Sequence, residues 1–197
     1  LAAGLVLLPK TEKHEGISPE ELLNNAISPE RYITTDELAS KIINQDPSIL
    51  LIDVRDSISH NEFSLKGAVN IPLSNLLSES SENFLDQDAY DVILFSNDNL
   101  MADQAWLLCT RLGYTNINVL KGGINEWYRT IINPTKPTEQ NSVIDMDLYA
   151  QRKAASMYFG VAYPEPFKKA PVIIKPKPVI KVVPKKKKKK MPIEGGC

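Results

Sequence analysis

Two continuous apolar runs stand in the middle of the chain, SILLIDVR at residues 48–55 and VILFS at residues 92–96. Neither run alternates between polar and apolar positions. This pattern is typical of strands that are buried on both faces of a parallel sheet. GAVNIP at residues 67–72 is a shorter strand candidate, and INVLKGG at residues 117–123 predicts a third main strand.

Helical patterns flank and separate these strands. They cover residues 19–25, 35–43, 102–112, 124–131 and 145–158. The first two begin with capping residues and acids in the first turn, and the third ends at Gly113 as a helix C-cap does. Its predicted apolar face consists of Ala105, Leu108, Cys109 and Leu112. Short alternation of strand and helix predicts an α/β fold with a parallel sheet flanked by helices.

The charges are divided unevenly along the chain. Up to Tyr163 there are 12 basic and 22 acidic residues, whereas from Pro164 onward there are 11 lysines and two glutamates. An acidic body is therefore followed by a basic tail, although the formal net charge of the whole chain is only -1. We expect the two parts to attract different partners.

The tail, residues 164–197, is rich in proline and lysine and has no pattern that closes a core. We expect it to be extended or disordered. Its lysine block would bind an anionic surface through charge alone: the domain itself, an acidic protein, anionic lipid or RNA. No aromatic residue follows Phe167, so we expect no specific nucleic-acid recognition. The block consists of Lys185, Lys186, Lys187, Lys188, Lys189 and Lys190.

Nine uncharged residues, LAAGLVLLP, open the sequence. A full membrane span needs about 20 apolar residues. We interpret this stretch as the end of a truncated membrane or signal segment, and the alternative is a short hydrophobic arm packed on the domain. The first interpretation predicts a membrane-associated protein facing the periplasm, and the second a cytoplasmic one.

These patterns divide the chain into five regions. They are the membrane or signal segment at 1–9, a helical extension at 10–32, the α/β domain at 33–133, a linker and helix at 134–163, and the tail at 164–197.

Three motifs of the domain resemble those of the rhodanese family. They are LIDVRD at residues 51–56, GAVNIP at residues 67–72 and LKGGINEW at residues 120–127. The resemblance implies a rhodanese-like parallel sheet flanked by helices, over about half of the chain. The motif residues to which we assign a structural role are Asp53, Arg55, Gly67, Gly122, Gly123 and Trp127.

In the rhodanese family the strand that resembles VILFS delivers a nucleophilic cysteine into a loop of the type C-x-x-G-x-[RK]. Here that cysteine is Ser96, the glycine is Asn99 and the basic residue is Met101. Asp98 and Asp103 add negative charge where an anionic donor would dock, which opposes its binding. We therefore expect no catalytic residue in this loop. It comprises Ser96, Asn97, Asp98, Asn99, Leu100 and Met101.

Two more positions depart from the family pattern Gly-His-Ile-x-Gly-Ala. Phe63 stands in place of the glycine and Ser64 in place of the histidine. His60 lies four residues too early, so we do not expect it to replace that histidine.

The cysteines and histidines lack the spacing of a metal site. We expect no metal and no cofactor. Cys109 lies on the apolar face of its predicted helix, where a free cysteine behaves as a small hydrophobe. Cys197 is the last residue and follows two glycines. It is the candidate sulfur carrier, against the alternative of an incidental or disulfide-linked terminus.

The sequence supports three hypotheses about function. The first is a catalytically inactive, membrane-tethered binding or scaffold module with an unidentified protein partner. The second is a sulfur-relay protein that carries a persulfide on Cys197. A phosphatase of the related fold is weaker, because such an enzyme also needs the loop cysteine that Ser96 replaces.

Overall fold

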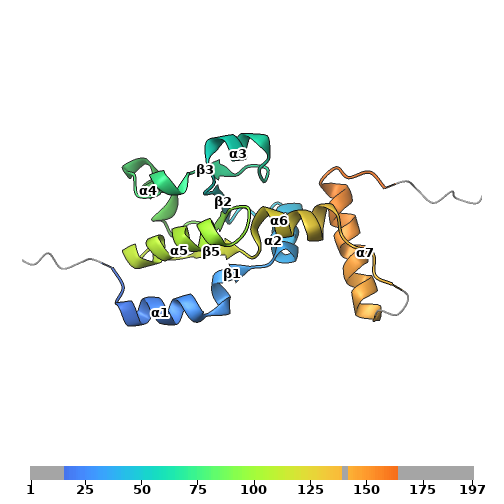
Figure 1. Ribbon diagram of the computed structural model, residues 1–197, viewed down its shortest axis with the longest axis horizontal. Coiled ribbons are helices and arrows are strands. Elements are labelled where there is room, and N and C mark those ends of the chain that lie inside the picture. The colour runs from blue at the N-terminus through green and yellow to red at the C-terminus, as the bar shows by residue number, and fades with distance from the viewer. Residues whose placement is uncertain (1–15, 139–141, 164–197) are drawn as a thin grey trace, which may run out of the picture. The chain divides into compact units, whose positions relative to one another are not determined.

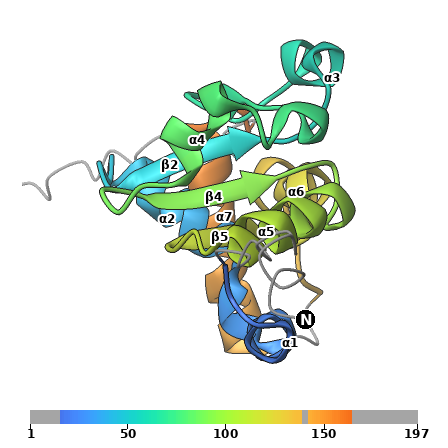
Figure 2. The ribbon, with the colours of Figure 1, turned by 90° about the vertical axis from the view of Figure 1, so that its left-hand side faces the viewer.

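The computed structural model describes residues 16–138 and 142–163. Five parallel strands form one sheet in the order β1-β5-β4-β2-β3 (Figures 1 and 2). They are β1 Tyr32–Ile33, β2 Ile49–Asp53, β3 Val69–Asn70, β4 Asp91–Phe95 and β5 Ile117–Leu120. The predicted parallel sheet is therefore confirmed.

In residues 16–138 and 142–163, seven α-helices accompany the sheet, with two short 3₁₀ helices and one π-helical turn, η4. The α-helices are α1 Pro19–Ile27, α2 Thr35–Ile43, α3 Ser57–Glu62, α4 Glu79–Leu85, α5 Leu100–Leu112, α6 Gly123–Trp127 and α7 Val143–Tyr158. The shorter elements are η2 Pro29–Arg31, η3 Leu73–Asn75 and η4 Tyr128–Ile132. Capping boxes at Thr34 and Ser142 fix the first turns of α2 and α7, because each side chain and its partner three residues on satisfy backbone N–H groups reciprocally.

The sheet carries a separate apolar core on each face. On one face, side chains of β2, β4 and β5 form one buried cluster with side chains of α4 and α5, with Leu85, Leu94 and Trp106 among its members. On the other face, α2, α6 and α7 cover the sheet, with Leu38 and Trp127 among the buried side chains. Strands covered on both sides need apolar residues at every position, and this explains the continuous apolar runs.

Helix α5 differs from its prediction in the face that it buries. Cys109 is buried as predicted, but Leu108 and Leu112 are exposed, while Ala102 and Trp106 are buried instead. The indole Nε1 of Trp106 donates to the carbonyl oxygen of Ile117, 3.1 Å away on β5. The buried face of the helix is thus turned toward Trp106: Ala105 and Cys109 of the predicted face stay buried, whereas Leu108 and Leu112 do not.

The strand predicted at residues 67–72 is shorter in the structure, since only Val69–Asn70 pairs with β2. The last domain helix also differs, because α6 ends at Trp127 and continues as the π-helical turn η4.

Helix α7 docks on the domain at three points. The Arg152 guanidinium binds the Asp36 carboxylate on α2, with 2.8 Å between Nε and Oδ1. The hydroxyl of Ser156 donates to the carbonyl oxygen of Ile132 at 2.7 Å. Phe159 meets the Trp127 ring edge-on, with 5.1 Å between centroids. The helix is therefore part of the same unit as the sheet.

Within the described parts of the chain, no helix is long and apolar enough to span a membrane. The predicted membrane segment at residues 1–9, the lysine block and Cys197 lie outside the described residues.

Candidate functional site

The loop at residues 96–101 lies at the carboxyl end of the sheet, where α/β folds place their binding sites. Strand β4 ends at Phe95 and leads directly into the loop, and α5 begins at Leu100. Asp53 ends the neighbouring strand β2 and pairs in register with Phe95. Figure 2 shows β2 and β4 side by side, running in the same direction. The parallel register therefore brings the Asp53 motif next to the loop.

The Ser96 side chain is enclosed by its own loop. Only 1 % of the residue is exposed. Its hydroxyl donates to the carbonyl oxygen of Asp98 at 2.6 Å and accepts from the backbone N–H of Ala102 at 3.2 Å. Both hydrogen-bonding functions of the hydroxyl are thus used to close the loop onto the start of α5.

The rest of the loop is bonded to the turn that follows β5. The side-chain oxygen of Asn99 accepts from Gly122 N–H at 2.6 Å. The carbonyl oxygens of Ser96 and Asn97 accept from the N–H groups of Ile124 and Asn125, at 2.9 and 3.0 Å. Asn99, which replaces the family's glycine, therefore has a structural task that a glycine could not perform.

The charged centre beside the loop is the carboxylate of Asp53, which is fully buried. Its Oδ1 accepts from Arg55 Nε at 2.9 Å, and its Oδ2 accepts from Arg55 Nη2 at 2.7 Å and from the Ser64 hydroxyl at 2.8 Å. Burial alone would raise the pKa of Asp53. The hydrogen bonds from Arg55, His60 and Ser64 outweigh burial, so the pKa is held below its usual value.

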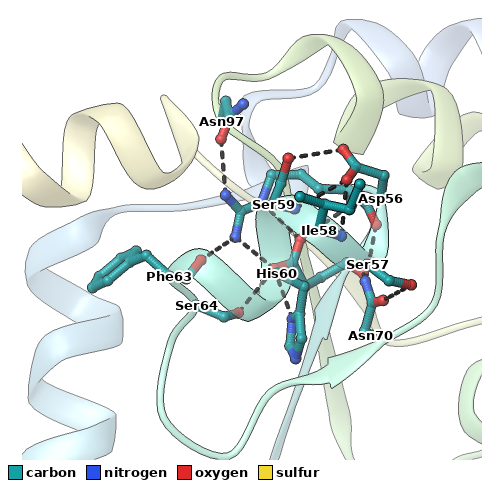
Figure 3. Close-up of polar contacts among 11 residues, drawn as sticks. Asp56, Ser57, Ile58, Ser59, His60, Phe63, Ser64, Asn70 and Asn97 are labelled. Carbon is teal, nitrogen blue, oxygen red and sulfur yellow. Dashed lines mark hydrogen bonds and ion pairs between the residues drawn. The ribbon is translucent and has the colours of Figure 1, made fainter.

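Arg55 connects this carboxylate to the loop and to the segment after α3. Its Nη1 donates to the side-chain oxygen of Asn97 at 3.0 Å, and its Nη2 also donates to the carbonyl oxygen of Phe63 at 2.6 Å. Figure 3 shows these contacts around Asn97, Phe63, Ser64 and His60. The buried guanidinium thus connects the end of β2 with the segment after α3 and with the loop at residues 96–101, which is distant in sequence.

His60 also reaches the Asp53 carboxylate, whereas the sequence assigns it no part in the motif. Its Nδ1 lies 3.0 Å from Asp53 Oδ2, the oxygen that also accepts from Ser64. The reason is helix α3, which places His60 in its last turn beside Ser64 despite the four-residue offset. No pattern in the sequence marked this short polar helix.

Asp103 does not leave a free charge at the loop, contrary to the sequence-based expectation. Its carboxylate lies 3.5 Å from the Arg31 guanidinium and accepts from the Tyr32 hydroxyl at 3.0 Å. Burial and the Asp103 carboxylate raise the pKa of Tyr32. Met101, at the position of the family's basic residue, packs against the core. The exposed Asp98 therefore supplies the negative charge of the loop itself.

Cys109, the cysteine within the described residues, is not placed to act as a nucleophile. Cys109 lies on the buried face of α5, and burial raises the pKa of its thiol to about 12. Almost no thiolate is present at neutral pH, and thiolate is the reactive form. Within residues 16–138 and 142–163, no group of His, Cys, Asp and Glu side chains could hold a metal ion.

These features define an α/β domain in which the loop between β4 and α5 is closed by its own hydrogen bonds. This loop lies beside a buried Asp-x-Arg motif. The model of the rhodanese-like domain family matches residues 34–130. This part of the chain is therefore a rhodanese-like domain and belongs to that family, as the three sequence motifs predict.

One curated relative is the adenylyltransferase and sulfurtransferase UBA4 of Meyerozyma guilliermondii, which is 30% identical over 115 residues. The match covers 54% of this chain and 26% of the relative, so this chain spans about a quarter of that protein's length. The domain is thus homologous to a sulfurtransferase.

Solved structures of rhodanese-like proteins are also similar to this chain. The rhodanese-like domain of Anabaena sp. Alr3790 is 23% identical, covering 57% of this chain and 91% of its own, with a TM-score of 0.45. The human single-domain sulfurtransferase TSTD1 is 24% identical, covering 49% of this chain and 94% of its own, with a TM-score of 0.41.

The enclosed loop leads to a prediction about restoring the missing thiol. We expect Ser96→Cys alone to transfer sulfur from thiosulfate no faster than the wild-type protein. The new thiol would be buried against the Asp98 carbonyl oxygen, and Met101 would supply no cation to lower its pKa. The measurement is thiocyanate formation from thiosulfate and cyanide, at equal protein concentration.

The matched comparison is the triple variant Ser96→Cys, Asn99→Gly, Met101→Arg, which restores the family pattern. We expect it to exceed the single variant, because it opens the loop and adds a positive charge. If both variants form thiocyanate, and at the same rate, the loop can catalyse sulfur transfer and lacks only its thiol.

Proposed function

We propose that this rhodanese-like domain is a catalytically inactive binding or scaffold module that recognises a protein partner. The observation that carries the proposal is the enclosure of Ser96, whose hydroxyl is bonded on both sides within the loop. A hydroxyl has no anion to offer near neutral pH, and its oxygen cannot carry sulfane sulfur reversibly. The burial of Cys109 supports the same proposal.

The test is incubation of the purified full-length protein with thiosulfate or with a persulfide donor, followed by intact-protein and peptide mass spectrometry. We expect no peptide to gain the mass of a sulfur atom. A cyanide-sensitive sulfur adduct on any residue would contradict the inactive module.

A sulfur relay on Cys197 is the second candidate function. It is favoured by the state of Cys109, because the chain has two cysteines and this one has a pKa of about 12. Any persulfide chemistry would therefore fall to Cys197. In the same experiment, an adduct present in the wild type and absent from Cys197→Ser would establish the relay. An adduct unchanged by Cys197→Ser would refute it.

We further propose that the module is held at a membrane by the segment that includes residues 1–9, with the domain facing the periplasm. The block of six lysines at residues 185–190 would add attraction to an anionic surface through charge. Separation of membranes from cells that express the full-length protein tests this. Release by high salt without detergent would show that charge, rather than an apolar anchor, holds it.

A further inference from the structure

An apolar groove runs between the segment after α3, the turn η4 and the end of α7. It consists of two adjoining cavities of 580 and 570 Å³, which share Phe63, Ile132, Phe159 and Gly160 as lining residues. We call it the aromatic groove. It is defined by Phe63, Trp127, Tyr128, Ile132, Tyr158 and Phe159.

The walls of the aromatic groove are held in place by contacts already described. Phe159 is fixed on Trp127 by their edge-on packing, and the carbonyl oxygen of Ile132 is bonded to Ser156 of α7. On the opposite wall, the carbonyl oxygen of Phe63 accepts from Arg55. Helix α7 packs against η4, the turn that continues α6, and these elements contribute one of the walls (Figure 1). A groove with fixed walls costs a ligand little reorganisation when it binds.

The rim of the groove exposes aromatic side chains to solvent. Phe63 is 48 % exposed, Tyr128 57 % and Tyr158 53 %. Aromatic residues are enriched at the centres of protein interfaces, where they bury large areas at little cost in side-chain entropy. These three half-exposed rings line two adjoining apolar cavities, Tyr158 one of them, Tyr128 the other and Phe63 both. Their grouping therefore indicates a binding surface.

The aromatic groove carries a positive charge, which favours a ligand with an acidic group. Of the described residues that line the two cavities, Lys66 is the one that carries a charge. No ion pair joins its amino group to another described residue. A ligand that presents an acidic group beside apolar side chains would match this arrangement.

We propose that the aromatic groove binds a linear segment of a partner protein, with two or more large apolar side chains and an Asp or Glu that pairs with Lys66. The proposal rests on the binding function proposed above and names its surface and the chemistry of its partner. Two adjoining cavities suit an extended segment, because its alternate side chains point to the same side about 7 Å apart and can enter one cavity each. One enclosed cavity would instead suit a compact small molecule.

The experiment selects random peptides from a displayed library on the full-length wild-type protein. Selected peptides are then synthesised and their Kd values measured by fluorescence anisotropy. We expect an enriched motif with an acidic residue and at least two large apolar residues. The double variant Phe63→Ser, Tyr128→Ser should weaken binding by tenfold or more, as loss of about 1.4 kcal/mol or more at an interface centre does.

The matched control is Phe84→Ser, because Phe84 is 39 % exposed on α4 and does not line either cavity. It should leave the Kd unchanged. Lys66→Glu should weaken acidic peptides, and a peptide with lysine in place of its acid should regain binding to that variant. Equal thermal unfolding midpoints for all variants would show that these effects are local.

Three outcomes would overturn the proposal. They are enrichment of peptides without an acidic residue, binding that Phe63→Ser, Tyr128→Ser leaves intact, and a dimer of this chain that this double variant abolishes. The last would assign the groove to a second copy. If the peptide experiment fails and mass spectrometry finds no sulfur adduct, the domain is still an inactive binding module, but it binds through another surface. A sulfur adduct would instead refute the proposed function itself.

Discussion

Asp53→Asn should lower the free energy of unfolding by about 3–5 kcal/mol, the usual loss when one partner of a buried ion pair is removed. The variant keeps the shape of the side chain but loses its charge. Arg55 would then stay buried, 5 % exposed, with no anion to offset it. Its bonds to Asn97 and to the Phe63 carbonyl oxygen would remain, but they cannot neutralise a guanidinium.

Urea unfolding followed by tryptophan fluorescence measures this loss, since Trp106 and Trp127 are both buried in the domain. The control is Asp36→Asn, which breaks a more exposed Arg–carboxylate pair between α2 and α7. We expect it to lose about 1 kcal/mol or less. Similar losses in the two variants would mean that the Asp53 pair is solvated in solution.

The stability of Asp53→Asn should also depend less on pH than the stability of the wild-type protein. The pKa of Asp53 is lower in the folded protein than its ordinary value. The contribution of the Asp53 carboxylate to the free energy of unfolding is therefore complete above a pH of about 4. It is lost as the pH falls through the folded-state pKa. Asp53→Asn should have a shallower loss of stability in acid. Asp46, whose pKa is lowered to about 2 mainly by bonds to Ser48, contributes to both proteins alike and cancels in the comparison.

The sheet could be predicted because its central strands are buried on both faces. That burial leaves a continuous apolar run in the sequence, as at Leu50 to Ile52 and Val92 to Phe95. The edge strand β1 has two residues, Tyr32 and Ile33, and leaves no such run. Helices α3 and α4 expose most of their length, so their polar sequences resemble loops.

The loop shows a different limit of sequence reasoning. The replacement of a cysteine by Ser96 is visible in the sequence, and so is the loss of nucleophilic chemistry. The two bonds that occupy the Ser96 hydroxyl depend on where the Asp98 carbonyl and the Ala102 N–H point. Asp103 was misread for the same reason, because its partners Arg31 and Tyr32 lie some seventy residues earlier in the chain.

Gly123→Ala should destabilise the protein by about 2–5 kcal/mol, through a clash and an unfavourable backbone conformation together. Gly123 has a φ of +59°, which side chains other than glycine rarely adopt. A Cβ there would lie 2.8 Å from the carbonyl carbon of Asn97 and from the carbonyl oxygen of Asp98, and closer still to the Ser96 oxygen. These are backbone atoms, so no side chain can rotate to relieve the contact.

Gly67→Ala is the control that separates the two causes. Gly67 also has a positive φ, +85°, but nothing lies within 4 Å of the position of a Cβ. Its loss should be limited to the backbone cost of about 1–2 kcal/mol. Gly123→Ala should in addition speed hydrogen exchange at the amides of Ile124 and Asn125, whose acceptors are the carbonyl oxygens of Ser96 and Asn97. Equal losses of stability with unchanged exchange would mean that the loop is not held by the glycine turn, and the enclosure of Ser96 would then need another cause.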